Sequence, residues 1–186
     1  MALDEVGRVK VWNTFFKLAR EQAVSAKKFQ DASWADPGHD FLGGTLGDKG
    51  IHSLGVVTWC LLALEAREAH LIEELKLPSL EAEKAHRAGI QDQWALLADS
   101  AGIHIDFGKP PHQAIAELDG LRNHLFHVNY ESLLAHLPSP RKAVSLFNEF
   151  VRAMEDMNVI LGRHKEADEG VLSIALDNKP SAHPQG

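Results

Sequence analysis

The sequence predicts an all-α protein, an up-and-down bundle of four long helices with additional short helices and a Gly-rich loop. Apolar residues recur at intervals of three and four along most of the 186 residues, a pattern typical of helices that bury one face. Residues 103–107 alternate in the way that a strand does, but no nearby segment alternates to pair with them. Pro and Gly fall between the periodic segments, where helices begin and end.

Length and composition predict one folded domain, over residues 1–165, followed by a tail at 166–186. Hydrophobic residues make up 45% and charged residues 24% of the chain, which are ordinary values for a globular protein. A net charge of -7 argues against a broad basic face for long nucleic acids. The single cysteine, Cys60, excludes disulfides and Cys-based zinc sites within one chain, and it favours a cytoplasmic location.

No membrane-spanning or secretory segment is expected. The longest stretch without a charged residue in the helical core, residues 50–64, is shorter than the roughly 20 apolar residues that span a bilayer. The first residues are acidic early and lack the basic and then apolar order of a secretory signal.

The helical segments follow one another with clear boundaries. The first helix is expected over residues 3–31, and the Gly-rich segment 31–50 is expected to be a long loop. The strongest helical pattern, residues 51–77, predicts a central helix, and the next helix is expected over 80–100 with Gly102 as its terminator. Two more are expected at 111–127, after Pro110-Pro111, and at 143–162, after the cap signature Ser139-Pro140.

One helical stretch carries residues suited to chemistry. At about 100° per residue, Asp119, Asn123 and His127 form a polar line beside the apolar side of the helix at 111–127. Arg122 is long enough to reach this line and can pair with Asp119. An arginine recognises phosphate oxygens, and a histidine titrates near neutral pH as acid–base catalysis requires. The alternative interpretation is a helix end with a solvated arginine and a capping histidine.

The motif R-N-x-x-x-H, late in a helix of an all-helical chain of this length, resembles the signature of the HEPN superfamily, and the helical layout over residues 3–165 is similar as well. The resemblance implies a homodimeric, metal-independent endoribonuclease without a cofactor, often a toxin with a partner antitoxin protein. In that family the ribose 2′-hydroxyl of the RNA is the nucleophile. Arg122 would then bind and polarise the phosphate, His127 would move the proton, and Asn123 would orient either of them.

Other residues complete this picture. One toxin branch has a tyrosine two residues after the histidine, whereas Tyr130 follows His127 by three. The chain departs from that branch at this position. The acidic balance of the chain favours the alternative function, a non-catalytic HEPN module that binds a nucleotide, RNA or a partner protein. His124 is expected to be a surface residue or a dimer contact. The RNA-binding rim would be supplied by residues that are near the motif in sequence, namely Lys109, His112, Arg141 and Lys142.

A metal centre is not expected. Glu83 and His86 form one E-x-x-H motif, but di-iron bundles need two such motifs and two further glutamates. The four tryptophans are interpreted as core or dimer contacts, with Trp34 as the exception because it lies in the Gly-rich loop.

Overall fold

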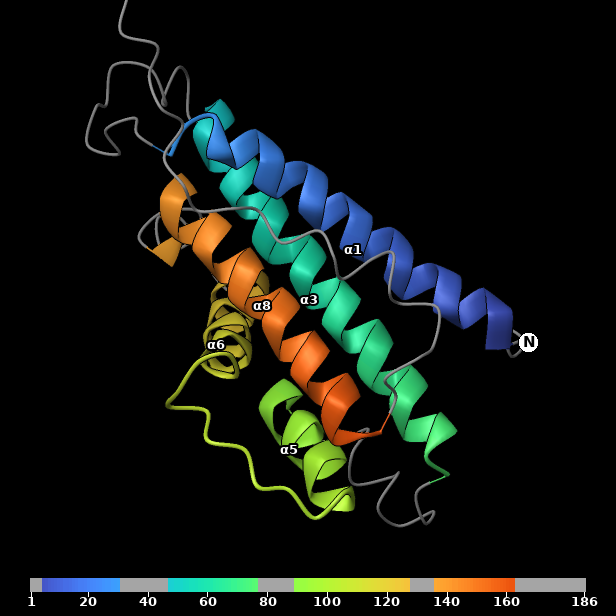
Figure 1. Ribbon diagram of the computed structural model, residues 1–186. Coiled ribbons are helices and arrows are strands. Elements are labelled where there is room, and N and C mark those ends of the chain that lie inside the picture. Colours follow the sequence, from blue (N-terminus) through green and yellow to red (C-terminus); the bar gives the residue numbers. More distant parts are fainter. Residues whose placement is uncertain (1–4, 31–46, 77–88, 128–135, 163–186) are drawn as a thin grey trace, which may run out of the picture.

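The computed structural model describes residues 5–30, 47–76, 89–127 and 136–162, and every regular element in these ranges is an α-helix (Figure 1). The all-α prediction is therefore confirmed. The helices are α1 (Glu5–Lys27), α3 (Asp48–Glu74), α5 (Ile90–Ser100), α6 (Gln113–His127) and α8 (Pro140–Ile160). Within these ranges, none of the helices combines the length and the apolar character that crossing a membrane requires.

Helix α3 lies at the centre of the bundle, as its dense apolar pattern predicts. The long helices α1, α3 and α8 lie side by side. On the side away from α1, the shorter helix α6 packs against α3 and α8, and α5 packs against α3 and α6 (Figure 1). Because α3 contacts each of the other four helices, its buried residues include polar ones that face α6 and α8.

The core between α1 and α8 is aromatic. Phe16 lies between Phe147 and Phe150, with ring centroids 5.7 and 6.0 Å apart, and Trp12 meets Phe16 edge-on at 6.0 Å. All four rings are fully buried. Burying one such side chain contributes about 1.5–3 kcal/mol, so this cluster is a main reason that α1 and α8 pack together.

Helix ends follow the predicted signatures. The Ser139 side chain accepts a hydrogen bond from the backbone N–H of Lys142 at 3.3 Å, and Pro140 occupies the first turn of α8. At the end of α5, Gly102 has a φ of +76°, a left-handed conformation that suits glycine. Residues 103–106 that follow have no regular structure, and the alternating pattern there forms no strand.

Several boundaries differ from the prediction or extend beyond the described residues. Helix α3 begins at Asp48, inside the predicted loop, because Gly47 adopts the extended backbone of an N-cap. Helix α6 begins at Gln113 and not at 111. Pro111 and His112 form a turn before it, in which their carbonyl groups accept hydrogen bonds from the N–H groups three residues on, at Ala114 and Ile115. The helix predicted from residue 80 is described only from Ile90. The structure therefore describes three long helices, α1, α3 and α8, whereas α5 has 11 and α6 has 15 residues in the described ranges. The fourth long helix of the predicted bundle stays a prediction.

Candidate functional site

The orientation of α6 agrees with its apolar pattern. Ile115 and Leu118 are fully buried, and Leu121 and Leu125 are half-buried against the same core. The predicted core side of this helix is therefore confirmed. The polar residues of the motif lie outside this buried side of α6. Arg122 faces α3, and Asn123 faces solvent.

Arg122 is anchored to the central helix. Its Nε lies 3.0 Å from Oε1 of Glu65 on α3, and the two side chains are 41% and 42% exposed. The Nε atom itself is buried and does not reach hydrogen-bond alignment, so the contact is an ion pair between half-exposed groups. Because Nε is buried, the exposed area of the side chain belongs to its other atoms. A guanidinium recognises phosphate oxygens, and the part of this side chain that remains exposed faces solution.

The predicted line of polar residues is present in part. Asp119 is half-buried and Asn123 is exposed. Among the described residues, Arg122 forms its ion pair with Glu65, and the expected pairing with Asp119 is not formed. The physical reason is that α3 packs directly on α6 and supplies a closer carboxylate. His127 is the last residue of α6, but its side chain lies outside the described part of the structure.

A buried carboxyl group lies behind Arg122. Glu68 on α3 is completely buried, and neither of its side-chain oxygens has a hydrogen-bond partner in the described ranges. Burial raises the pKa of Glu68 well above its usual range, and the negative charges of Glu65 and Asp119 raise it further, while Arg122 opposes them. Burial thus favours the protonated form of this carboxyl group.

Glu68 was not predicted as a site residue. Its place in the sequence contained the signal, because Leu64 and Ile72 lie four residues before and after it and Leu71 lies three after it. A glutamate in the middle of an apolar stripe at helical spacing is expected to be buried.

The two lysines of the predicted RNA-binding rim are paired with carboxylates. The Nζ of Lys109 lies 2.8 Å from Oδ2 of Asp106, and the Nζ of Lys142 lies 2.8 Å from Oε2 of Glu117. The Lys109 bond lowers the pKa of Asp106 and raises the pKa of Lys109. Their roles in substrate binding stay predictions, since a phosphate would compete with these pairs.

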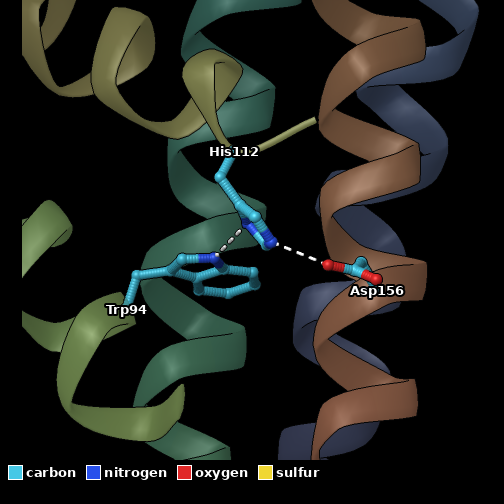
Figure 2. Close-up of polar contacts among 3 residues, drawn as sticks. All are labelled: Trp94, His112 and Asp156. Atoms are coloured by element: carbon cyan, nitrogen blue, oxygen red, sulfur yellow. Dashed lines mark hydrogen bonds and ion pairs between the residues drawn. The ribbon is translucent and has the colours of Figure 1, made fainter. Parts of the chain in front are cut away.

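His112 lies inside the bundle, on the segment just before α6. Its Nδ1 accepts a hydrogen bond from Nε1 of Trp94 at 3.1 Å, and its Nε2 lies 2.8 Å from Oδ2 of Asp156 (Figure 2). The imidazole is 8% exposed, and both of its nitrogens are engaged. The predicted role of His112 in substrate binding stays a prediction, but its observed contacts join α5, α6 and α8.

His124 is less accessible than expected for a surface residue. Its half-buried ring stacks on that of His136, with centroids 3.7 Å apart and an interplanar angle of 9°. The two rings connect the end of α6 with the residues that precede α8. A dimer contact at His124 stays a prediction.

Some predicted features lie beyond the described ranges, namely Trp34, the Glu83/His86 motif and Tyr130. Trp12 and Trp94 are fully buried, which confirms their assignment to the core, and half-buried Trp59 stacks on Phe15. Within the part of the chain that the structure describes, no three His, Cys, Asp or Glu residues are grouped closely enough to hold a metal ion.

In comparisons with family models, curated proteins and solved structures, no match to the chain was found. The resemblance to the HEPN superfamily therefore rests on the motif and the helical layout. The class that the structure itself defines is an all-α helical bundle with an arginine-bearing site at the edge between α3 and α6.

Proposed function

We propose that the protein is a HEPN-type, metal-independent endoribonuclease that cleaves RNA at a cleft between two copies of the chain. The observation that supports this most is the state of Arg122, whose side chain is 41% exposed and whose Nε faces Glu65. Asn123 is exposed next to it, and His127 follows on the same helix. The residue types needed to bind a phosphate and to move a proton are thus carried by one short segment.

The proposed reaction uses the RNA itself as the nucleophile. The 2′-oxygen attacks the adjacent phosphorus while a base takes its proton, and the bond from phosphorus to the 5′-oxygen breaks as that oxygen receives a proton. Arg122 stabilises the negative charge that builds on the phosphoryl oxygens. His127 of one copy serves as the base and His127 of the other as the acid, which is why the dimer is part of the proposal. An antitoxin protein that covers this cleft would restrain the activity.

The test is cleavage of a defined RNA in the presence of EDTA. We expect Arg122→Ala to lower the rate about 10²- to 10³-fold and His127→Ala to lower it about 10²- to 10⁴-fold. Arg152→Ala and His104→Ala change an exposed arginine and an exposed histidine elsewhere and serve as matched controls. An RNA with a 2′-deoxynucleotide at the cleaved position should resist the enzyme. Cleavage that survives the double variant Arg122→Ala, His127→Ala contradicts the proposal.

A second function is supported by the charge balance of the site. Arg122, Lys109 and Lys142 each form an ion pair with a carboxylate, and the chain carries a net charge of -7. Such a surface attracts long RNA weakly. This favours a non-catalytic HEPN-like module that binds a nucleotide, RNA or a partner protein. RNA or nucleotide binding that is lost in Arg122→Ala, without any cleavage by the wild-type chain, would distinguish this function from catalysis.

A further inference from the structure

Helix α1 and the residue that follows it carry a concentration of positive charge. Residues 5–28 contain six Lys or Arg and two Glu, which gives them a net charge of +4, whereas the whole chain has a net charge of -7. Six of the 19 cationic residues thus lie in this segment, against two of the 26 acidic residues. Lys and Arg clustered along one helix are the electrostatic footprint expected of a surface that binds a polyanion.

Three of these cations lie on the outer face of the helix. Lys17 and Arg20 are exposed, and so is Lys28, which directly follows α1. At about 100° per residue, Lys17 and Arg20 are about 60° apart around the helix axis, and at about 1.5 Å per residue Lys28 lies about 16 Å further along it than Lys17. Helix α1 is at the edge of the bundle, where it packs on α3 and α8 (Figure 1). Its outer face is therefore open to solvent.

The cations on this face are not neutralised by carboxylates. Within the described ranges, the side chains of Lys17, Arg20 and Lys28 form no ion pair or hydrogen bond. Four cations elsewhere each have a carboxylate oxygen within 3.0 Å, namely Lys109, Arg122, Lys142 and Arg152. A phosphate that approaches α1 therefore meets charged donors without first having to displace a carboxylate from them.

The other residues of α1 argue against a membrane or an acidic protein as the partner. A helix that lies on a lipid surface needs a free apolar side, but Trp12 and Phe16 of α1 are fully buried in the core. Interfaces between proteins depend on aromatic anchors and are depleted in lysine, and no exposed residue between positions 11 and 27 is aromatic. A nucleic acid backbone requires only accessible cations along a line.

We propose that the outer face of α1 binds the phosphate backbone of RNA through Lys17, Arg20 and Lys28. The inference rests on the proposed function in taking RNA as the polymer, but it places this contact on α1, away from Arg122 on α6. At 3.4 Å per nucleotide of a stacked strand, about 16 Å of helix spans about five nucleotides, so the three side chains can contact separate phosphates. Contacts to phosphates alone select no base sequence.

The experiment measures the binding of fluorescein-labelled 2′-O-methyl oligouridine to the full chain by fluorescence anisotropy at several salt concentrations. This probe lacks the free 2′-hydroxyl, so the proposed reaction cannot cleave it. The double variant Lys17→Gln, Arg20→Gln should bind about tenfold or more weakly at low salt. The logarithm of its association constant should depend less steeply on the logarithm of the salt concentration, by about 1.4 in slope, or about 0.7 for each lost phosphate contact.

Two further variants control for the total charge of the protein. Lys76→Gln together with Arg152→Gln removes one lysine and one arginine from exposed positions on other helices or their ends, and it should leave the slope unchanged. Glu21→Gln removes the exposed carboxylate from the same face of α1 and should tighten binding about two- to threefold at low salt. Circular dichroism checks that each variant is folded.

Several outcomes overturn the inference. One is oligouridine binding by Lys17→Gln, Arg20→Gln that equals binding by Lys76→Gln, Arg152→Gln. Another is equal or tighter binding of polyglutamate by the wild type, which would assign the face to an acidic protein. Tighter binding to phosphatidylserine vesicles than to oligouridine would assign it to a membrane.

The same measurements separate this inference from the proposed catalysis. If the wild type cleaves RNA and the variant Lys17→Gln, Arg20→Gln binds oligouridine as the wild type does, the α1 surface is wrong and the ribonuclease proposal stands. If the wild type cleaves no RNA but binds oligouridine in a way that depends on Lys17 and Arg20, catalysis is wrong and the α1 surface stands.

Discussion

The indole N–H of Trp94 donates a hydrogen bond to Nδ1 of His112 at 3.1 Å. This contact determines which nitrogen of the histidine ring carries the proton. An indole nitrogen is a donor only, so Nδ1 must present its lone pair. The proton of the neutral ring is then on Nε2, which donates to Oδ2 of Asp156 at 2.8 Å (Figure 2). A buried neutral imidazole thus connects helices α5 and α8 through the segment before α6.

Replacement of His112 by phenylalanine should destabilise the fold. His112→Phe keeps a planar ring but leaves the fully buried indole N–H of Trp94 without an acceptor, which costs about 1–3 kcal/mol. Asp156 is 47% exposed, so Asp156→Ala should cost less than about 1 kcal/mol. Urea unfolding followed by circular dichroism measures both. A larger loss in Asp156→Ala than in His112→Phe would show that the hydrogen bond to Asp156, and not the indole bond, is the stronger connection.

A second buried connection joins α3 and α8 and gives the next prediction. Nη2 of Arg67 donates to Oδ1 of Asn158 at 2.8 Å, and its guanidinium carbon lies 4.9 Å from the ring centroid of Trp12. Because the donor is charged and buried, Asn158→Ala should lower the free energy of unfolding by about 1.5–3 kcal/mol. Asn123→Ala changes an exposed asparagine and should stay within about 0.5 kcal/mol. Equal unfolding midpoints of the two variants would contradict this prediction.

The cap of α8 provides a prediction that follows from sequence and structure alike. Ser139→Ala removes the hydroxyl that accepts from the backbone N–H of Lys142, and the loss should be about 0.5–2 kcal/mol. Ser139→Asn restores a capping side chain and should recover most of it. Thermal unfolding of the wild type, Ser139→Ala and Ser139→Asn ranks the three proteins by stability. If Ser139→Asn is as unstable as Ser139→Ala, the hydroxyl bond does not explain the effect.

The sequence predicts features that depend on one helix alone. Spacing within α6 places Ile115 and Leu118 in the core, and Ser139-Pro140 marks the start of α8, because both depend on the geometry of a single helix. The ion-pair partner of Arg122 cannot be predicted in this way, because it lies on another helix. Glu65 is 57 positions away in the chain, and its approach depends on how α3 rotates and shifts against α6. A carboxylate closer in sequence, Asp119, was therefore expected in its place.

Buried polar residues show the same limit. Glu68 interrupts an apolar stripe and can be placed in the core by its spacing, but its lack of a hydrogen-bond partner depends on every helix around it. The contacts of His112 likewise need α5 and α8 at once. Periodicity specifies which side of a helix is buried, and it does not specify what a buried polar group meets there.

The raised pKa of Glu68 leads to a prediction about pH. Burial raises the pKa of this carboxyl group in the folded protein, whereas in the unfolded chain it titrates near the ordinary value of about 4.3. Between these two pKa values the folded state holds a proton that the unfolded state has released. The free energy of unfolding therefore falls as the pH rises through this window, and the contribution present below about pH 4.3 is lost.

Glu68→Gln removes this titration while it keeps the shape of the side chain. At pH 4 the variant and the wild type should be about equally stable, and at pH 8 the variant should be more stable by about 1.4 kcal/mol for each unit by which the folded pKa exceeds the unfolded one. Urea unfolding at intervals between pH 4 and pH 8 measures the difference, with Glu73→Gln as an exposed control on the same helix. Curves for wild type and Glu68→Gln that stay parallel across this range would show that the pKa of Glu68 is the same in the folded and unfolded protein. That result contradicts the prediction, because only a pKa that differs between the two states makes stability depend on pH.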